Sequence, residues 1–244
     1  MALKSFQHDH HTYSISYDIV NPLAKYDLII LHDWGSNKKI MKQAFKPYMD
    51  QFRHIYIDLP GFGASINHAV LDSWEYARIM EVFLELIGAK KEIIVGHSFG
   101  GKVATLLNPD LLVLLSSAGI KLPKPLNVLL KIRLTKLANM FGLRQLASLF
   151  RAQDAKELNV LMYETFKKVV DEDFSEEFAN FYNKALICWG ESDTATPLEA
   201  GEKIAELIKN NRFTVYQGDH FFFLNRAKSI ASEIEETFLR PVKD

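Results

Sequence analysis

Three residues that can cooperate in nucleophilic catalysis, a serine, an aspartate and a histidine, stand far apart in this chain of 244 residues. Ser98 lies within Gly96-His97-Ser98-Phe99-Gly100-Gly101, where glycines flank the serine at the spacing Gly-x-Ser-x-Gly. Glycines at this spacing allow a sharp turn between a strand and a helix, which exposes the serine hydroxyl. The same turn leaves the backbone N–H of Phe99 free to meet an oxyanion. The motif therefore predicts a nucleophile elbow.

A serine needs a base to accept its proton, and the base needs an acid to orient it and to stabilise its charge. Asp193 follows the apolar segment 184–189, and His220 follows the segment 212–216. Each comes directly after an expected strand, as Ser98 does, so both are candidates to complete a triad. The alternatives are that Asp193 only caps the helix beginning at Pro197, and that His220 is a surface histidine.

The elements that would position these residues alternate between strands and helices. Residues 3–7 and 12–19 alternate in polarity and predict an antiparallel hairpin. Apolar runs predict buried strands at 27–32, 53–58, 91–95, 111–116, 184–189 and 212–216. Between them we expect helices ending near residue 50, at 71–87, after Ser98, at 197–209 and at the C-terminal end, near residue 239. This order predicts an α/β fold with a mostly parallel, doubly wound sheet.

Only helical patterns occur between residues 119 and 183, which predicts a helical lid inserted between two core segments, 1–118 and 184–244. Leu126, Leu130, Leu134, Leu137 and Phe141 share one expected helix face. Residues 119–151 contain no acidic residue and carry a charge of +7, from Lys121, Lys124, Lys131, Arg133, Lys136, Arg144 and Arg151. This basic lid would suit an acidic partner, or is simply a solvated face.

Composition excludes several classes of protein. The net charge of −1 provides no general attraction to nucleic acid, and no apolar run approaches the ~20 residues that span a bilayer. The N-terminal residues lack the apolar segment of a secretion signal, and the single Cys188 cannot form an intrachain disulfide, so we expect a cytoplasmic protein. His8-Asp9-His10-His11 fits an exposed turn better than a metal site. We expect neither metal nor cofactor, and a small-molecule substrate.

Four motifs together resemble those of the α/β-hydrolase fold superfamily: Gly96 to Gly101, Asp58-Leu-Pro-Gly-Phe-Gly63, Trp189-Gly-Glu-Ser-Asp193 with Thr196-Pro197, and Gly218-Asp219-His220-Phe221. The resemblance covers roughly residues 27–118 and 184–240. It implies a serine hydrolase in which Ser98 is the nucleophile, His220 the base and Asp193 the acid. It also implies an oxyanion hole formed by the backbone N–H groups of Trp34 and Phe99.

The chain departs from this pattern at several positions. Asp33 stands where the family usually has glycine, and it adds a negative charge beside a site that must stabilise one. Asp219 replaces a common glycine before the base, and Asn225 stands where an acidic residue is frequent. We expect His32 and His97 to hydrogen-bond loop backbone rather than to carry protons.

Three kinds of hydrolase fit these motifs, and the chemistry expected of each is acyl transfer to water through an acyl-enzyme. The broadest is a carboxylesterase. The second is a carbon–carbon bond hydrolase of meta-cleavage products, whose layout and Thr196-Pro197 loop are similar. The third is a carrier-protein-linked methyl ester esterase, which resembles this chain in Trp34-Gly35-Ser36-Asn37 and in Asp58 to Gly63. A non-catalytic binding protein on the same fold is the alternative from a different class.

Overall fold

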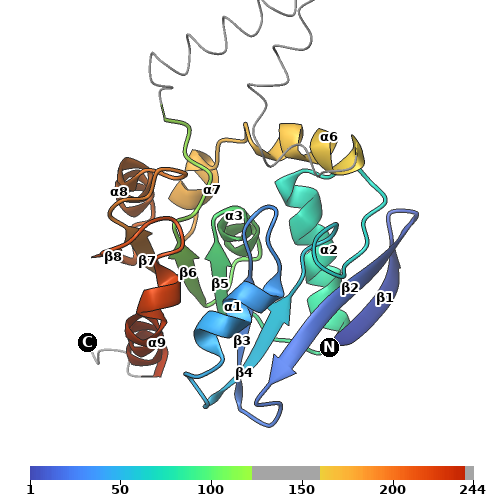
Figure 1. Cartoon of the computed structure of the whole chain (residues 1–244), viewed down its shortest axis with the longest axis horizontal. Helices are drawn as coiled ribbons and strands as arrows, with labels where there is room; N and C mark the ends of the chain where they lie inside the picture. The colour runs from blue at the N-terminus through green and yellow to red at the C-terminus, as the bar shows by residue number, and fades with distance from the viewer. Residues whose placement is uncertain (123–159, 240–244) are drawn as a thin grey trace, which may run out of the picture.

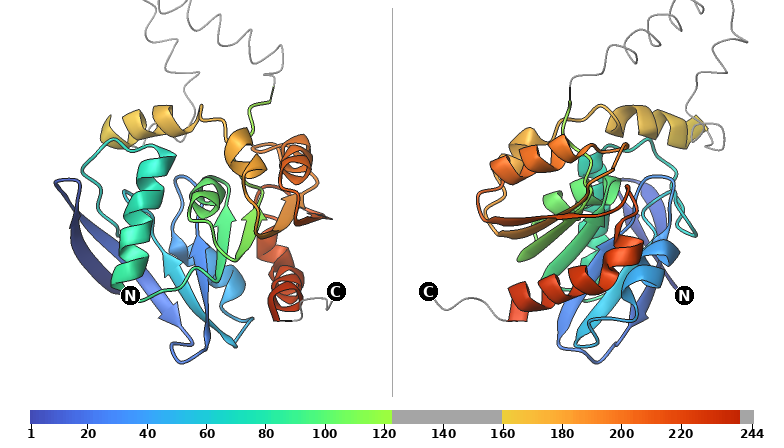
Figure 2. Two further views of the ribbon diagram at one scale, coloured as in Figure 1. Left: turned by 180° about the vertical axis from the view of Figure 1, so that it is seen from behind. Right: turned by 60° about the vertical axis from the view of Figure 1, so that its left-hand side comes forward.

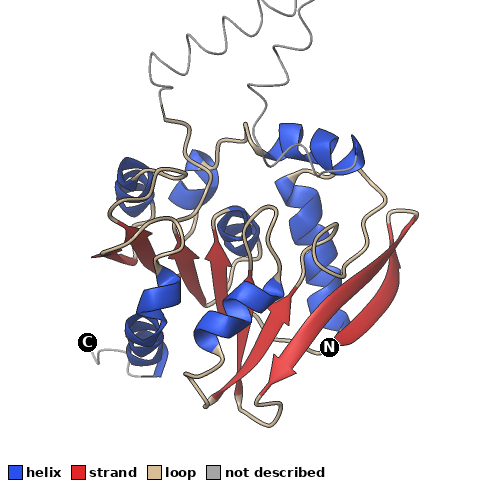
Figure 3. Cartoon of the chain, in the orientation of Figure 1, coloured by secondary structure: helices blue, strands red, loops and turns tan. Residues whose placement is uncertain are grey.

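A single eight-stranded sheet forms the centre of the computed structural model, which describes residues 1–122 and 160–239 (Figures 1 and 3). The strands are β1 (Ala2–His8), β2 (His11–Val20), β3 (Tyr26–Leu31), β4 (Phe52–Ile57), β5 (Ile93–His97), β6 (Leu111–Leu115), β7 (Lys184–Gly190) and β8 (Asn211–Tyr216). The helices are α1 (Lys38–Phe45), α2 (Ser73–Leu86), α3 (Phe99–Leu106), α6 (Val160–Val169), α7 (Ser175–Ala179), α8 (Leu198–Leu207) and α9 (Phe223–Leu239). The predicted α/β class is confirmed.

The sheet has the strand order β1-β2-β4-β3-β5-β6-β7-β8. The hairpin β1–β2 is antiparallel and joins β4 in antiparallel pairing, whereas all pairs from β4 to β8 are parallel. Alternation in polarity predicted the hairpin, and continuous apolar runs predicted the parallel strands, because a parallel strand is covered on both faces. The loop at Asp9 and His10 turns the hairpin with positive φ at both residues.

Helices cover both faces of the sheet (Figure 2). Successive side chains of a strand point to opposite faces, so Leu28 and Ile30 belong to one core while Ile29 and Leu31 belong to the other. The first core packs against α1 and α9, and the second packs against α2, α3 and α8. The helices on the two faces of the sheet hold the strands in place. The carboxyl ends of the strands are followed by the loops that carry the predicted site residues.

Local signals determine where the helices begin. Asn37 accepts a hydrogen bond from the backbone N–H of Lys39 and caps α1. Asp72 and Glu75 form a reciprocal capping box at the start of α2. The predicted helix that ends near residue 50 is shorter in the structure, because α1 ends at Phe45.

The strand order brings the loops after β3 and β5 together. β4 pairs with one edge of β3 and β5 pairs with the other. The connection from β3 to β4 and the connection from β4 to β5 therefore run to opposite sides of β3. In parallel α/β sheets such a switch point opens a crevice at the carboxyl ends of the strands. The loop that holds Asp33 and Trp34 therefore faces the elbow at Ser98.

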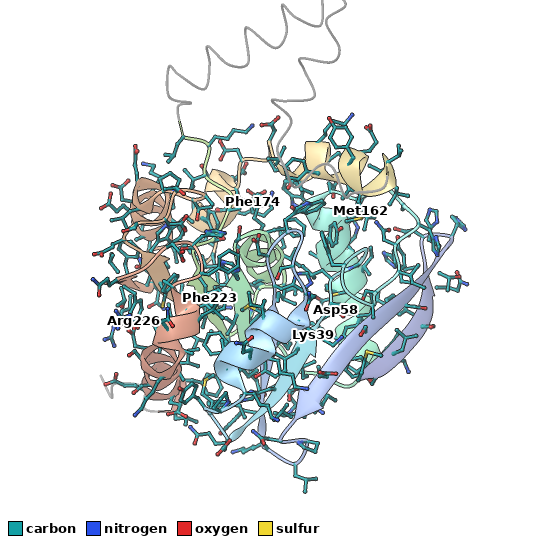
Figure 4. The ribbon with its side chains drawn as sticks, in the orientation of Figure 1. Lys39, Asp58, Met162, Phe174, Phe223 and Arg226 are labelled. Carbon is teal, nitrogen blue, oxygen red and sulfur yellow. The ribbon has the colours of Figure 1, made fainter. Side chains whose placement is uncertain are left out.

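The described part of the predicted lid consists of α6, α7 and the segments beside them, and it lies at this end of the sheet (Figure 1). Figure 4 shows Met162 and Phe174 at the same end of the molecule. The apolar face from Leu126 to Phe141 and most of the basic residues lie outside the described residues, so the lid boundaries remain a prediction. Among the described helices, none is both long and apolar enough to cross a membrane.

Candidate active site

Ser98 occupies the sharp turn between β5 and α3. Its backbone has φ 50° and ψ −113°, a strained conformation outside the regions that ordinary residues favour. The turn needs glycine nearby: a Cβ on Gly96 would lie 2.4 Å from the carbonyl oxygen of Gly100, and a Cβ on Gly100 would lie 2.6 Å from that of His32. These contacts give the physical reason for the Gly-x-Ser-x-Gly spacing.

Asp193 and His220 form a hydrogen-bonded pair. Nδ1 of His220 lies 2.7 Å from Oδ2 of Asp193. Asp193 also accepts hydrogen bonds from the backbone N–H groups of Ala195 and Thr196, at 2.8 and 2.9 Å. Burial alone would raise the pKa of the Asp193 carboxyl, but His220 and Thr196 outweigh it and lower the pKa to about 2. Asp193 thus keeps its charge and holds a proton on Nδ1 of His220, which leaves Nε2 as the basic nitrogen.

The imidazole of His220 is more basic than an ordinary histidine. Burial lowers the pKa of His220. The hydrogen bond to Asp193 and the charges of Asp193, Asp33 and Asp219 raise this pKa by more than burial lowers it, so the net shift is upward. The Oδ2 atom of Asp33 lies 3.8 Å from Nε2 of His220, on the face opposite Asp193. His220 therefore lies between two carboxylates.

The Asp33 carboxyl engages the groups expected to form the oxyanion hole. Its Oδ1 atom accepts a hydrogen bond of 2.5 Å from the backbone N–H of Trp34. The backbone N–H of Phe99 and the hydroxyl of Ser98 also act on this carboxyl and lower its pKa. The sequence predicts a negative charge near this position but not a side chain that turns toward the Trp34 N–H.

Two buried histidines support the loops around the site. The backbone N–H of Leu59 donates to Nε2 of His32, so the proton is on Nδ1, which donates to the carbonyl of Asp33 at 2.6 Å. Nε2 of His97 lies 3.0 Å from the backbone carbonyl of His220 and donates to it. Burial lowers the pKa of His32 to about 4 and that of His97 to about 3, so both rings are neutral.

Asp58 has a structural role beside the site. Its Oδ2 atom accepts from the N–H of Ala64 at 3.1 Å, in the turn that follows Pro60 and Gly61. Asp58 also binds both the backbone N–H and the Nζ of Lys38, at 2.8 and 2.6 Å (Figure 4 labels Asp58). Lys38 is 3 % exposed, so this is a buried ion pair between the loop and the start of α1.

A cavity of about 370 Å³ opens in front of Ser98. Its lining is mainly apolar and comes from the oxyanion loop, from α3, from the segment after β6 and from α6, with Trp34, Phe99, Ile120, Leu122, Phe166 and Val169 among the lining residues. The indole of Trp34 packs between the rings of Phe62, Phe99 and Phe166, with centroid distances of 4.8 to 5.4 Å. A cavity of this size and lining is typical of a site for a small apolar ligand.

The wall of this cavity includes a buried ion pair, Lys102–Glu172, that no local sequence pattern predicts. Nζ of Lys102 on α3 lies 2.5 Å from Oε2 of Glu172, which follows α6, and 2.7 Å from the carbonyl of Val169. Glu172 also accepts hydrogen bonds from the backbone N–H and the hydroxyl of Ser73, the first residue of α2. One carboxylate therefore ties the described lid segment to two core helices.

Within residues 1–122 and 160–239, no group of three or more histidine, cysteine or acidic side chains is arranged to hold a metal ion. The site brings together a strained serine, a histidine–aspartate pair and the carboxyl of Asp33.

The family of the chain follows from comparison with known proteins. The model of the alpha/beta hydrolase family matches residues 28–233, and the chain belongs to this family. The predicted resemblance and fold class are confirmed.

Two relatives from Vibrio species are both named pimeloyl-(acyl-carrier protein) methyl ester esterase. The protein of Vibrio atlanticus is 25% identical over 243 residues, which cover 85% of this chain and 92% of the relative. That of Vibrio vulnificus strain YJ016 is 38% identical over 82 residues, which cover 32% of this chain and 29% of the relative. The Vibrio vulnificus relative is thus matched over less than a third of its length, and the Vibrio atlanticus relative over most of it.

Solved structures share the fold over the whole chain. A hydrolase from Pseudomonas aeruginosa superposes with a TM-score of 0.75 and 20% sequence identity, covering 98% of each chain. An esterase from Thermogutta terrifontis superposes with a TM-score of 0.71 and 16% identity, covering 98% of this chain and 99% of that one. At such identities the likeness defines the fold alone.

Proposed function

We propose that the protein is a serine hydrolase that cleaves carboxylic esters of small or medium acyl groups through a Ser98–His220–Asp193 triad. The observation that carries this proposal is the 2.7 Å hydrogen bond between His220 and Asp193 at the same end of the sheet as the strained elbow of Ser98. The apolar cavity beside Ser98 supports an apolar acyl group as the substrate portion.

In the proposed reaction His220 accepts the Ser98 proton at Nε2 while Oγ attacks the ester carbonyl carbon. The carbonyl electron pair moves to oxygen, which faces the backbone N–H groups of Trp34 and Phe99. Collapse of this intermediate returns the pair, and His220 passes its proton to the departing alcohol. Water then attacks the acyl-enzyme by the same route and releases the acid. Asp193 stays ionised and stabilises the imidazolium throughout.

Labelling with a fluorophosphonate tests the proposal, because this reagent phosphonylates only an activated serine. We expect wild-type protein to be labelled at neutral pH and Ser98→Ala to remain unlabelled while folding normally by circular dichroism. Hydrolysis of p-nitrophenyl esters of graded chain length then measures the acyl group that the cavity accepts. Absence of labelling at every pH between 5 and 10 would exclude a serine hydrolase.

A methyl ester on an acyl chain linked to a carrier protein is the second candidate substrate. The Vibrio atlanticus relative supports it, since that protein is named for such a substrate and matches over most of both chains. The seven basic residues between 119 and 151 offer charge complementarity to an acidic carrier. Residue Lys121 of this block lines the cavity.

Salt dependence separates the two substrates. Hydrolysis of the carrier-linked ester should weaken with rising ionic strength, whereas hydrolysis of the free methyl ester should not. Replacing Lys131, Arg133 and Lys136 by glutamine should reduce turnover of the carrier-linked ester only. Replacing Lys203, Lys209 and Lys228 by glutamine removes the same charge elsewhere and is the matched control. Equal kinetics in both triple variants would exclude a role of the basic block.

A further inference from the structure

The side chain of Asp33 lies where the oxyanion of an ester intermediate would have to bind. Its carboxyl accepts a 2.5 Å hydrogen bond from the Trp34 N–H, and the Phe99 N–H and the Ser98 hydroxyl act on the same carboxyl. These are the two backbone donors and the nucleophile of the proposed reaction. A carboxylate is a good ligand for two N–H donors for the same reason that an oxyanion is, since both present a negatively charged oxygen.

An ionised carboxyl in this position opposes the reaction in two ways. It occupies the Trp34 N–H, one of the two donors that should lower the barrier, and its charge repels the negative charge that develops on the carbonyl oxygen. Loss of a single oxyanion donor lowers the rate by about 10²–10³. The ionised form of the site is therefore a poor catalyst even with a complete triad.

The surroundings of Asp33 favour its neutral form. The side chain is 15% exposed, and burial raises the pKa of the Asp33 carboxyl above its ordinary value, although His220, Ser98 and the two N–H groups act in the opposite direction. The titratable side chains near it are His220, with Asp219 beside it, from the loop after β8, and the neutral His32 from its own loop. From α6, the apolar Phe166 packs on Trp34. Among the described residues, His220 is the cation that can balance Asp33.

We propose that Asp33 is a proton-dependent catalytic residue of the oxyanion hole: its carboxylate blocks the hole, and its neutral carboxylic acid opens it and donates a hydrogen bond to the substrate carbonyl oxygen. This inference rests on the proposed ester hydrolysis. A neutral acid binds N–H donors more weakly than a carboxylate does, so the side chain can turn aside when the substrate oxygen enters. The acid keeps its proton during attack and collapse, so the proton from Ser98 still goes to His220 and then to the leaving alcohol.

One proton shared between Asp33 and His220 decides whether the site is active. With the proton on His220 the pair is ionic, the hole is blocked and the base is already protonated. With the proton on Asp33 the hole opens and Nε2 is free to accept from Ser98. Both forms have the same net charge, so pH does not interconvert them, and a substrate that expels water favours the neutral form because it removes the solvation of both charges.

The pH dependence of the rate follows from this arrangement. Below the first apparent pKa of the pair both groups are protonated and His220 cannot act as a base. Above the second, Asp33 is ionised and the hole is blocked. We expect a bell-shaped profile in which the alkaline limb belongs to Asp33.

The test measures kcat/KM on a p-nitrophenyl ester and the rate of fluorophosphonate labelling from pH 4.5 to 10. Asp33→Asn presents a permanently neutral amide that can donate, and Asp33→Gly vacates the hole. Both variants should lose the alkaline limb and exceed wild type at pH 9 by about 10²-fold, the scale of an oxyanion donor. Their acid limbs should not move to lower pH, because Asp33 is already protonated and uncharged in the acid limb of the wild type.

Asp219→Asn is the matched control, because it removes a carboxylate that also raises the pKa of His220 but that bonds to the Phe221 N–H instead of the oxyanion donors. It should shift the acid limb and keep the alkaline limb. An alkaline limb that persists in Asp33→Asn and Asp33→Gly, or rates below wild type at every pH in both, would overturn the inference while leaving the serine hydrolase intact. If wild type and all variants fail to label, the proposed function itself is wrong, and the inference that depends on it falls with it.

Discussion

The imidazole of His97 donates a hydrogen bond of 3.0 Å from Nε2 to the backbone carbonyl of His220, which links the residue before the proposed nucleophile to the proposed base. The two rings lie side by side with centroids 4.6 Å apart. The central strand β5 places His97 directly before the elbow, whereas His220 lies in the loop after the edge strand β8. This single contact therefore sets the position of one half of the site against the other.

Replacing His97 by leucine should reduce kcat by about tenfold with little change in KM, because the His220 carbonyl loses its buried donor and the base loses its fixed position. His97→Gln keeps an N–H donor of similar reach and should restore most of kcat. Steady-state kinetics on one p-nitrophenyl ester distinguishes the two variants. An equal loss in both would mean that packing of the ring, and not its hydrogen bond, positions His220.

Asp193→Asn should lower kcat by about 10⁴-fold, the scale found for the acid of a serine–histidine–aspartate triad. The amide cannot hold a proton on Nδ1 of His220 as the carboxylate does, so the wrong nitrogen faces Ser98. Glu191→Gln is the matched control, since Glu191 is exposed in the same loop. Retention of more than a tenth of the activity in Asp193→Asn would remove Asp193 from the triad.

Breaking the Lys102–Glu172 pair should destabilise the protein by about 3–5 kcal/mol, because a lone buried charge remains. The Lys102 and Glu172 side chains are 2% and 10% exposed. We expect Lys102→Met and Glu172→Gln each to lower the urea midpoint of unfolding. The double variant Lys102→Met/Glu172→Leu should recover much of the loss, since no unpaired charge is left. Additive losses in the double variant would contradict a buried ionic link.

Acid should weaken the fold between pH 6 and 4.5 through buried histidines, chiefly His32 and His97, while the lowered pKa of His54 acts in the same direction. The native pKa is about 4 for His32 and about 3 for His97, against about 6.5 in an unfolded chain. In this range the unfolded state binds more protons than the native state. The free energy of unfolding therefore decreases as the pH is lowered, by about 2.5 kcal/mol per pH unit when both His32 and His97 contribute. Asp193, whose pKa is lowered to about 2, loses its contribution only at lower pH, below the ordinary range of a carboxyl.

Urea unfolding at pH 6, 5.25 and 4.5 measures this slope. His97→Gln should reduce it by about half, because one of the two neutral histidines no longer titrates on unfolding. His10→Gln changes an exposed histidine of the hairpin turn and should leave the slope as it is in wild type. Equal slopes in His97→Gln and wild type would mean that other groups cause the acid sensitivity.

Much of the fold was predictable because its signals are local. Continuous apolar runs such as 111–115 mark strands covered on both faces, and the glycines around Ser98 mark a turn in which a Cβ would meet backbone. The order of Ser98, Asp193 and His220, each after a strand, also placed all three at one end of a parallel sheet. The predicted helix near residue 50 ran too long because Pro47, which lacks a backbone N–H, ends the helix at Phe45 although the buried Met49 follows.

Contacts between side chains that are distant in the chain could not be predicted from local patterns. Lys102 and Glu172 are separated by 70 residues, and Lys38 and Asp58 by 20, so neither pair shares a local pattern. Their burial arises only when α3 meets the lid segment and when α1 packs beside the loop after β4. In both cases a charged side chain that composition assigns to the surface is enclosed by packing.

Asp33 shows most clearly which features the sequence determines and which features only the tertiary structure determines. Its residue type and its place after β3 were readable from the chain, and they already predicted a negative charge near the oxyanion site. Only the strand order, which sets β3 beside β5, and the side-chain conformation bring that carboxyl onto the Trp34 N–H and within 3.8 Å of His220. The sequence by itself determined which chemical groups are present at this end of the sheet. The tertiary structure decided which of them touch, because hydrogen bonds depend on distance and angle and not on position in the chain.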